Sequence, residues 1–420
     1  MPPPKPYLVY FAVAVSLLTG VQPLFAADAP APASASATSA GQPAATTPPA
    51  APDAGAPRGN RAGGGAGRGG RGGPMTPEDQ AKIAQLANLP IWKPGVGDGD
   101  YRLVPDATKT PPYNDLTNPA YAPAPENARR EGVAKGRVET FHIPQAGSKF
   151  YPPPSGGGRG APAAPVASGA ADAGPMREVN VYIPAGYVAG TPAPLLFCHD
   201  AMGMHDNKPA PYLPDILDNL IAAKRLPPMI AVMVMPFPNP QRSQEYDTVS
   251  GKFAEYVEAE ILPVVEQKYN VKFSKDPDAR AVIGGSSGAA AAMSMAWFHT
   301  ELWHRVHLFS PTFTALRRDP ETAPHGAWEF HENFIPKSPV KPLRVWLEVG
   351  ERDNGATGSD AGMSNWVFAS IHTAAVLKAK GYHYQFVYAP EAGHVDRPVR
   401  SHTLAPALEW LWQDYKPATK

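Results

Sequence analysis

Residues 281–290 read Ala-Val-Ile-Gly-Gly-Ser-Ser-Gly-Ala-Ala, and a helix-forming run continues from them to Phe298. Within this stretch Gly284, Ser286 and Gly288 fit the pattern Gly-x-Ser-x-Gly. A sharp turn from strand to helix strains the backbone of the central serine, so its neighbours must be small. Such a turn holds the hydroxyl above the sheet edge, where the helix N-terminus favours a developing negative charge. The pattern predicts Ser286 as a nucleophile. Ser287 is the competing nucleophile, and a tight glycine turn with idle serines is the alternative.

On both sides of this turn, apolar runs alternate with helical segments. The runs interpreted as strands are 136–143, 177–184, 194–197, 229–234, 281–283, 306–309, 343–347 and 384–388. Several are apolar throughout, as expected when helices cover both faces of a parallel sheet. The helices expected beside them are 253–269, bent near Pro263, then 289–298, and about 365–380 with Gly381 as C-terminal cap. The sequence therefore predicts one α/β domain with a mostly parallel central sheet.

The serine needs two partner side chains, because its hydroxyl is too weakly acidic to attack an ester without a base. A histidine must take its proton, and an acid must orient that histidine. The strand over 343–347 runs into an acid-rich turn, in which Asp353 is the predicted acid. Glu351 and Asp360 are its rivals, and an acid that only caps the next helix is the alternative.

The predicted histidine is His394, which follows the last strand and comes after the acid in chain order. From that place it can reach over to the nucleophile. Among the 12 histidines of the chain, His402 is the fallback. Two tryptophans, Trp328 and Trp366, are candidates for the pocket lining, with core packing as the alternative for each.

An oxyanion hole requires two backbone N–H groups, and Ser287 is expected to supply one of them. The second is expected from the loop after the strand over 194–197, where Ala201 and Met202 are the nominated donors. Two His-Asp pairs in the same loop, at 199–200 and 205–206, leave a metal site as an alternative. No further ligands stand at a recognisable spacing, so no metal is expected.

Two more side chains bear on the site. Arg242 follows the strand over 229–234 and is a candidate to bind an anionic group of the substrate, with a structural ion pair as the alternative. Cys198 is the only cysteine, so no intrachain disulfide can form. Its apolar neighbours predict a buried thiol rather than a nucleophile.

The N-terminal residues predict export. Residues 1–26 carry Lys5, an apolar run and a small-residue cleavage site, which is typical of a signal peptide. Residues 27–74 are rich in Ala and Pro and then in Gly and Arg, which predicts a disordered linker. A wrapping segment over 75–135 and an α/β domain over 136–416 follow. The helix of the wrapping segment is expected to start at Thr76-Pro77.

The 420 residues carry 38 Lys+Arg and 38 Asp+Glu. This balance gives no electrostatic reason to expect a nucleic acid or an anionic membrane as partner. The protein is therefore expected to be secreted or periplasmic, with no stable membrane insertion after signal cleavage.

Several of these motifs together resemble an esterase family that includes enterochelin esterase, feruloyl esterases and esterase D. They are Gly284 to Gly288, Gly350 to Asp353, Gly393-His394, Arg242 to Asp247, the helix ending 260–263 and the C-terminal run 407–412. The resemblance covers roughly residues 136–415. It departs from the family at 197–201, where Asp-Gly would be expected, and this bears on the second oxyanion donor.

The resemblance implies an α/β-hydrolase fold, a Ser-Asp-His mechanism without metal or cofactor, and hydrolysis of a carboxylic ester. Its members act on siderophore esters, aromatic esters of plant polysaccharides and simple acyl esters. The substrate expected here is therefore a small-molecule or polysaccharide-linked ester. Two alternatives stay open: an acyltransferase on the same fold, and a non-catalytic secreted domain that binds carbohydrate or the cell envelope.

Overall fold

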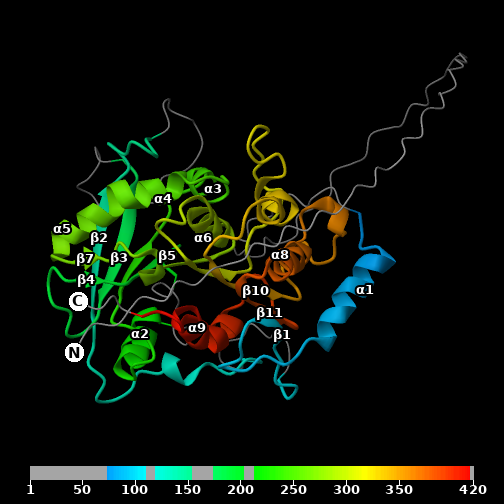
Figure 1. Cartoon of the computed structure of the whole chain (residues 1–420), viewed down its shortest axis with the longest axis horizontal. Coiled ribbons are helices and arrows are strands. Elements are labelled where there is room, and N and C mark those ends of the chain that lie inside the picture. Colours follow the sequence, from blue (N-terminus) through cyan, green and yellow to red (C-terminus); the bar gives the residue numbers. More distant parts are fainter. Residues whose placement is uncertain (1–72, 110–118, 154–173, 203–211, 417–420) are drawn as a thin grey trace, which may run out of the picture. The chain divides into compact units, whose positions relative to one another are not determined.

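The computed structural model describes residues 73–109, 119–153, 174–202 and 212–416, all within one structural unit, Gly65–Lys420. These residues form a nine-stranded sheet with the strand order β1-β11-β10-β9-β8-β5-β6-β3-β2 (Figure 1). The strands are β1 (Gly99–Arg102), β2 (Arg137–Pro144), β3 (Met176–Ile183), β5 (Leu195–His199), β6 (Ile230–Val234), β8 (Arg280–Gly285), β9 (Arg305–Phe309), β10 (Arg344–Gly350) and β11 (His383–Ala389). A separate pair joins β4 (Pro192–Ala193) to β7 (Lys272–Phe273).

In the strand order from β1 to β6 every pairing is parallel, and at the other edge β3 pairs antiparallel with β6 and β2 pairs antiparallel with β3. Every predicted strand is present within a few residues of its expected bounds. The predicted mostly parallel sheet is confirmed.

Helices cover both faces of the sheet because successive side chains of a buried strand point to opposite sides. On β5, Leu195 and Phe197 join one apolar cluster, whereas Leu196 and Cys198 join the other. Three sets of helices pack in the first cluster: α4 (Lys252–Tyr256) with α5 (Leu262–Tyr269), α6 (Ser287–Phe298) and α8 (Trp366–Lys380). The second cluster contains α2 (Leu213–Ala222) and α9 (Arg397–Trp412) (Figure 1). This is the predicted three-layer arrangement.

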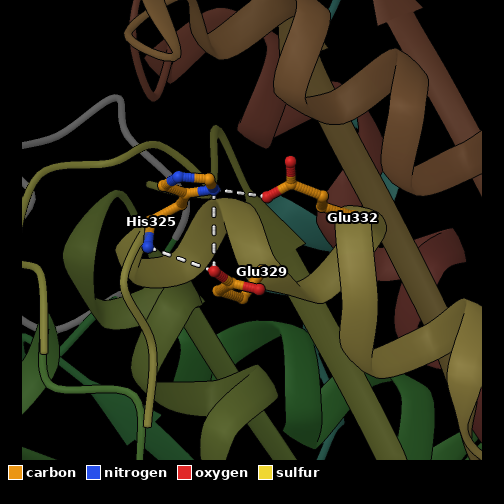
Figure 2. Close-up of side chains that lie close together, drawn as sticks. All are labelled: His325, Glu329 and Glu332. Atoms are coloured by element: carbon orange, nitrogen blue, oxygen red, sulfur yellow. Dashed lines mark hydrogen bonds and ion pairs between the residues drawn. The ribbon is translucent and has the colours of Figure 1, made fainter. Parts of the chain in front are cut away.

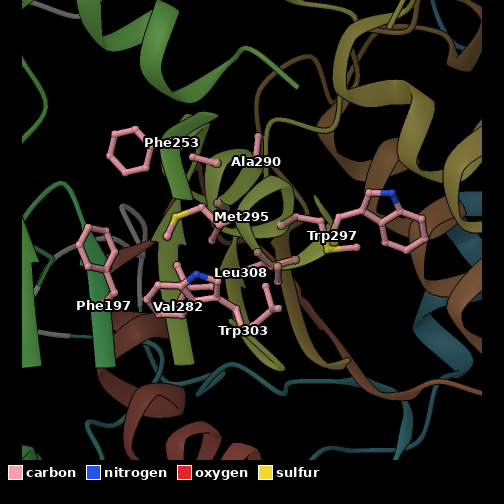
Figure 3. Close-up of a cluster of buried hydrophobic side chains, with 14 of the residues drawn as sticks. Phe197, Phe253, Val282, Ala290, Met295, Trp297, Trp303 and Leu308 are labelled. Carbon is pink, nitrogen blue, oxygen red and sulfur yellow. The ribbon is translucent and has the colours of Figure 1, made fainter. Parts of the chain in front are cut away.

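Helix α6 lies inside the first cluster and is buried almost along its whole length. Its small residues, such as Ala290, let it approach the sheet, while Met295 and Trp297 fill the space beside it (Figure 3). Val282 of β8 and Leu308 of β9 form the floor below it. The helix that follows the predicted nucleophile is therefore held by the core on all sides.

The helix predicted over 253–269 is interrupted rather than merely bent. A π-helical segment, η3 (Val257–Ile261), separates α4 from α5, and Pro263 lies in the first turn of α5. A proline has no N–H to donate and clashes with the preceding turn, which the wider π turn accommodates. Helix α8 has the predicted ends, with Asn365 as N-cap and Gly381 in the left-handed conformation as C-cap.

The segment before residue 136 contributes more than a wrapping layer. Helix α1 (Pro77–Gln85) starts at Thr76 with a full capping box to Asp79, as its sequence predicts. Strand β1, which the sequence analysis did not predict, pairs in parallel with β11 at the edge of the main sheet. Short 3₁₀ turns complete the segment: η1 (Leu86–Asn88) and η2 (Pro125–Asn127).

Some predictions fall on residues without a described structure. The signal peptide over 1–26 and nearly all of the linker over 27–74 lie outside the described ranges. Within those ranges, no helix combines the length and the apolar character needed to cross a bilayer.

Candidate active site

Ser286 occupies the turn between β8 and α6, with φ 57° and ψ −126°. Such a conformation costs a non-glycine residue about 1–3 kcal/mol and is kept only where the surroundings enforce it. The two glycines of the motif allow it. A Cβ on Gly284 would collide with the carbonyl of Gly288, and a Cβ on Gly288 would lie 2.9 Å from Oδ2 of Asp200. The strained turn predicted from Gly-x-Ser-x-Gly is therefore present.

The serine faces the predicted histidine. Oγ of Ser286 lies 2.8 Å from Nε2 of His394, and Nδ1 of the same ring lies 2.5 Å from Oδ1 of Asp353. The Asp353 side chain is fully buried, and its Oδ1 also accepts the N–H of Asn354 at 2.7 Å. An imidazole held in this way can take a proton from the hydroxyl on one side while the carboxylate stabilises the resulting positive charge on the other.

These side chains meet because the strands that precede them are parallel. Ser286 follows β8, Asp353 follows β10 and His394 follows β11, and the carboxyl ends of parallel strands lie at the same sheet edge. The sequence separations of 67 and 41 residues are thus bridged by the topology alone.

The loop that carries the histidine is anchored on both sides of the ring. Asp396 accepts the N–H of Gly393 at 3.1 Å, and the hydroxyl of Ser310 accepts the N–H of Val395 at 2.9 Å. Burial raises the pKa of Asp396, which also caps α9 through the N–H of Val399. Trp366 packs edge-on against the imidazole, with ring centroids 6.0 Å apart.

The rival residues lie elsewhere. Glu351 accepts the backbone N–H of Glu391, and Asp360 binds the ring of His372. Nδ1 of His402 binds the carbonyl oxygen of Ala122. The structure thus brings Ser286, Asp353 and His394 together and leaves their competitors outside the cluster.

The nominated oxyanion donors are only partly supported. Ser287 is the first residue of α6, where a helix leaves its N–H groups without intrahelical partners. The other two N–H groups are already engaged: that of Ala201 donates to Val234 at 3.0 Å, and that of Met202 donates to His199 at 3.1 Å. As arranged here, neither Ala201 nor Met202 offers a free donor, because the turn after β5 folds back on its own strand.

Arg242 lies on α3 (Gln241–Tyr246) and forms an ion pair with Asp200 through two hydrogen bonds of 3.0 and 2.9 Å. Its guanidinium also lies over the ring of Tyr246. Asp200 stands in the loop after β5, with a positive φ of 55°. The structural ion pair left open by the sequence is therefore present, and it consumes two of the five N–H groups of Arg242.

Of the two His-Asp pairs after β5, the structure describes only His199-Asp200, whose carboxylate is bound by Arg242. His199 is fully buried, and burial lowers its pKa to about 3. The second His-Asp pair, 205–206, lies outside the described residues. Cys198 is buried, and burial raises the pKa of its thiol, as expected for a packed rather than a reactive cysteine.

A different group of potential metal ligands lies at the two ends of η5 (Gly326–Trp328) and on η6 (Phe330–Phe334). His325, Glu329 and Glu332 bring one ligand atom each within 4.8 Å of one another (Figure 2). Nδ1 of His325 binds Glu332 at 2.5 Å, and the buried Glu329 accepts the backbone N–H of His325 at 3.1 Å and a hydrogen bond from Asn333. His325 is thus already hydrogen-bonded to both glutamates.

Trp328 lines a cavity of about 630 Å³ that also contacts α1 and α8. Neither Ser286 nor His394 is among the residues lining it. Trp366, which touches the imidazole of His394, is thus the tryptophan that borders the site.

Sequence reasoning missed two hydroxyl residues, Ser310 and Thr312. Ser310 supports the histidine loop, and the Thr312 hydroxyl lies 3.4 Å from Oγ of Ser286. Both lie in the turn after β9 at the same sheet edge, and that position is the only signal that could have found them.

Comparison with solved structures returns esterases. An enterochelin esterase from Shigella flexneri shares 22% identity with a TM-score of 0.44, over 57% of this chain and 55% of that one. A second Shigella flexneri structure, the enterobactin esterase with enterobactin, shares 19% at 0.48, over 70% and 64%. A ferulic acid esterase from the anaerobic fungus Anaeromyces mucronatus shares 17% at 0.48, over 70% and 96%.

This chain therefore spans between half and two thirds of the length of the two bacterial esterases. Among curated proteins, none matches the sequence. The family assignment rests on another comparison. The model of the family described as "Putative esterase" matches residues 171–411, more than half of the chain and all three residues of the triad. The chain belongs to this family of esterases.

Proposed function

We propose that this esterase hydrolyses carboxylic esters through an acyl-enzyme, with Ser286 as nucleophile, His394 as general base and acid, and Asp353 as the orienting carboxylate. One observation carries the proposal: a continuous relay of 2.8 Å from Ser286 to His394 and 2.5 Å from His394 to Asp353. The contact between Ser286 and His394 is within the range that proton transfer needs, and the contact between His394 and Asp353 orients the imidazole.

In the first half-reaction, Oγ of Ser286 bonds to the ester carbonyl carbon and its proton passes to Nε2 of His394. The C–O bond of the alcohol then breaks, and the imidazolium returns the proton to the leaving oxygen. The N–H of Ser287 stabilises the negative oxygen of the tetrahedral intermediate. In the second half-reaction water attacks the acyl-enzyme by the same route and releases the acid.

The substrate we propose is a small-molecule or polysaccharide-linked ester. Two of the compared esterases are named for enterobactin and ferulic acid. A panel of siderophore, feruloyl, acetyl-sugar and short-chain acyl esters would identify the preferred acyl and alcohol groups.

The proposed mechanism is tested with Ser286→Ala on p-nitrophenyl acetate. We expect turnover to fall by several orders of magnitude, because only the serine oxygen can carry the acyl group. Ser287→Ala is the matched control, since it removes the neighbouring hydroxyl but keeps the backbone N–H. A fluorophosphonate should label the wild type and Ser287→Ala but not Ser286→Ala. Undiminished turnover by purified Ser286→Ala, or absence of labelling in the wild type, would end the proposal.

We also propose that residues 1–26 direct export and that the mature protein begins near residue 27. The support is the charge, apolar run and small-residue site described above. Intact mass of the protein recovered from the culture medium or periplasm tests this, and an uncleaved N-terminus would contradict it.

A further inference from the structure

The Thr312 hydroxyl is held beside the nucleophile by the main chain. Its backbone N–H donates to the carbonyl of Ser286 at 3.1 Å, and the N–H of Ser286 donates to Phe309 at 2.9 Å. The side chain is 2% exposed, with Oγ1 lying 3.4 Å from Oγ of Ser286. Because these two backbone bonds position residue 312, its hydroxyl can be removed without removing the residue from its place.

Thr312 lies on the side of the serine that faces the histidine. It follows β9, which lies between β8 and β10, whereas the nominated oxyanion donors follow β5 on the other side of β8. Ser310, two residues earlier, touches Val395 next to His394. The hydroxyl is therefore placed away from the oxyanion loop and toward the imidazole.

Two oxygens exchange protons with His394 during the reaction, that of the leaving alcohol and that of the incoming water, and both must lie on this side of Ser286. The leaving alcohol must receive a proton from Nε2, and the incoming water must give one to Nε2. Each must therefore stand between the imidazole and the acyl carbon carried by Oγ of Ser286. A threonine hydroxyl can donate to such an oxygen or accept from it by rotation about one bond.

We propose that Thr312 is a further catalytic residue, whose hydroxyl hydrogen-bonds the leaving alcohol oxygen and then the hydrolytic water. The inference rests on the proposed acyl-enzyme mechanism. In deacylation the water oxygen bonds to the acyl carbon while its proton passes to Nε2 of His394. The bond to Oγ of Ser286 then breaks, and the serine takes that proton back. Thr312 keeps its own proton throughout.

The two half-reactions should depend on Thr312 unequally. The alcohol oxygen is already tethered to the acyl group when acylation begins, so its place is set by the bound substrate. Water arrives without a tether, and its orientation must come from hydrogen bonds in the site. Loss of the hydroxyl is thus expected to slow deacylation more than acylation.

The test compares Thr312→Val, which keeps the shape, with Thr312→Ser, which keeps the hydroxyl. With p-nitrophenyl acetate, p-nitrophenolate leaves without needing a proton, so acylation reports on Ser286 and deacylation on the water. We expect Thr312→Val to slow deacylation about tenfold and acylation less than threefold. Intact mass spectrometry during turnover should then show more acetylated protein for Thr312→Val than for the wild type. Thr312→Ser should behave like the wild type.

Equal slowing of both steps, a loss that Thr312→Ser does not restore, or unchanged deacylation in Thr312→Val would each overturn the role. The rate of fluorophosphonate labelling in each variant checks that Ser286 and His394 remain assembled. Failure of the acyl-enzyme mechanism itself would look different, because then the wild type would show no acetylated protein and no dependence on Ser286.

Discussion

Replacement of Asp353 by Asn tests how much the buried carboxylate contributes through its charge alone. Oδ1 of Asp353 accepts both the N–H of Asn354 and the hydrogen on Nδ1 of His394, while its Oδ2 is buried without a hydrogen-bond partner among the described residues. An asparagine can place its carbonyl oxygen at the Oδ1 position and its amide nitrogen at the Oδ2 position. It would then keep the tautomer of the imidazole and lose only the negative charge.

The expected loss of transition-state stabilisation in Asp353→Asn follows from that geometry. Two unit charges about 4 Å apart attract by about 4 kcal/mol at an effective dielectric constant near 20. The amide dipole retains part of this attraction for the imidazolium, so we expect the transition state to lose about 3 kcal/mol. This corresponds to a fall in kcat of roughly a hundredfold. Asp353→Ala should fall further, because it also leaves two N–H groups without an acceptor.

The assay is the pH dependence of kcat on p-nitrophenyl acetate, with Glu351→Gln as the control. Glu351 is the rival acid in the same turn and accepts the N–H of Glu391 and the hydroxyl of Tyr388, which a glutamine oxygen can also do. We expect the control to stay within a few-fold of the wild type. A folded Asp353→Asn enzyme with wild-type kcat, or an equal loss in Glu351→Gln, would refute the assignment of Asp353.

Three other changes test the surroundings of the triad. Gly288→Ala places a methyl group 2.9 Å from Asp200, so urea unfolding should show a destabilisation of roughly 1–3 kcal/mol. Arg242→Gln should lower turnover on neutral and acidic esters alike, because it releases Asp200; a KM increase confined to acidic esters would show a substrate contact instead. His307→Phe should make the free energy of unfolding depend less on pH below 6.5. Burial lowers the pKa of His307 from 6.5 to about 3, so the unfolded chain binds a proton that the folded protein refuses. Wild-type stability is therefore lost as pH falls below 6.5, by about 1.4 kcal/mol per pH unit for this group, and unfolding at pH 4.5 and 7 measures the difference.

The sheet and the triad could be predicted because both require particular types of side chain at particular positions in the sequence. Continuous apolar runs such as 229–234 indicate strands that are covered on both faces. Ser286, Asp353 and His394 each stand in the turn directly after such a run. Since the carboxyl ends of parallel strands lie at one edge, their position in the sequence places all three residues at that edge.

Features that depend on backbone hydrogen bonds and strand pairing do not require particular side chains, so the sequence does not reveal them. Strand β1 (Gly99–Arg102) reads Gly-Asp-Tyr-Arg, in which only Tyr101 favours strands, and it pairs with β11 at the sheet edge. The second oxyanion donor is a backbone N–H, which any residue carries, so Ala201 and Met202 could be nominated only by their place in the chain. Thr312 is adjacent to Ser286 because β9 neighbours β8, and sequence does not specify that pairing.

The turn after β5 gives Arg242 a structural role. Asp200 and Ala201 both adopt positive φ, at 55° and 44°. Without glycine each such residue costs roughly 1–2 kcal/mol, which contacts elsewhere must offset. The ion pair from Arg242 does this from one side of Asp200, and the missing side chain of Gly288 leaves the space that Asp200 occupies on the other. Arg242 thus holds a strained turn, and we expect the effect of Arg242→Gln on turnover to pass through the position of residues 200–202.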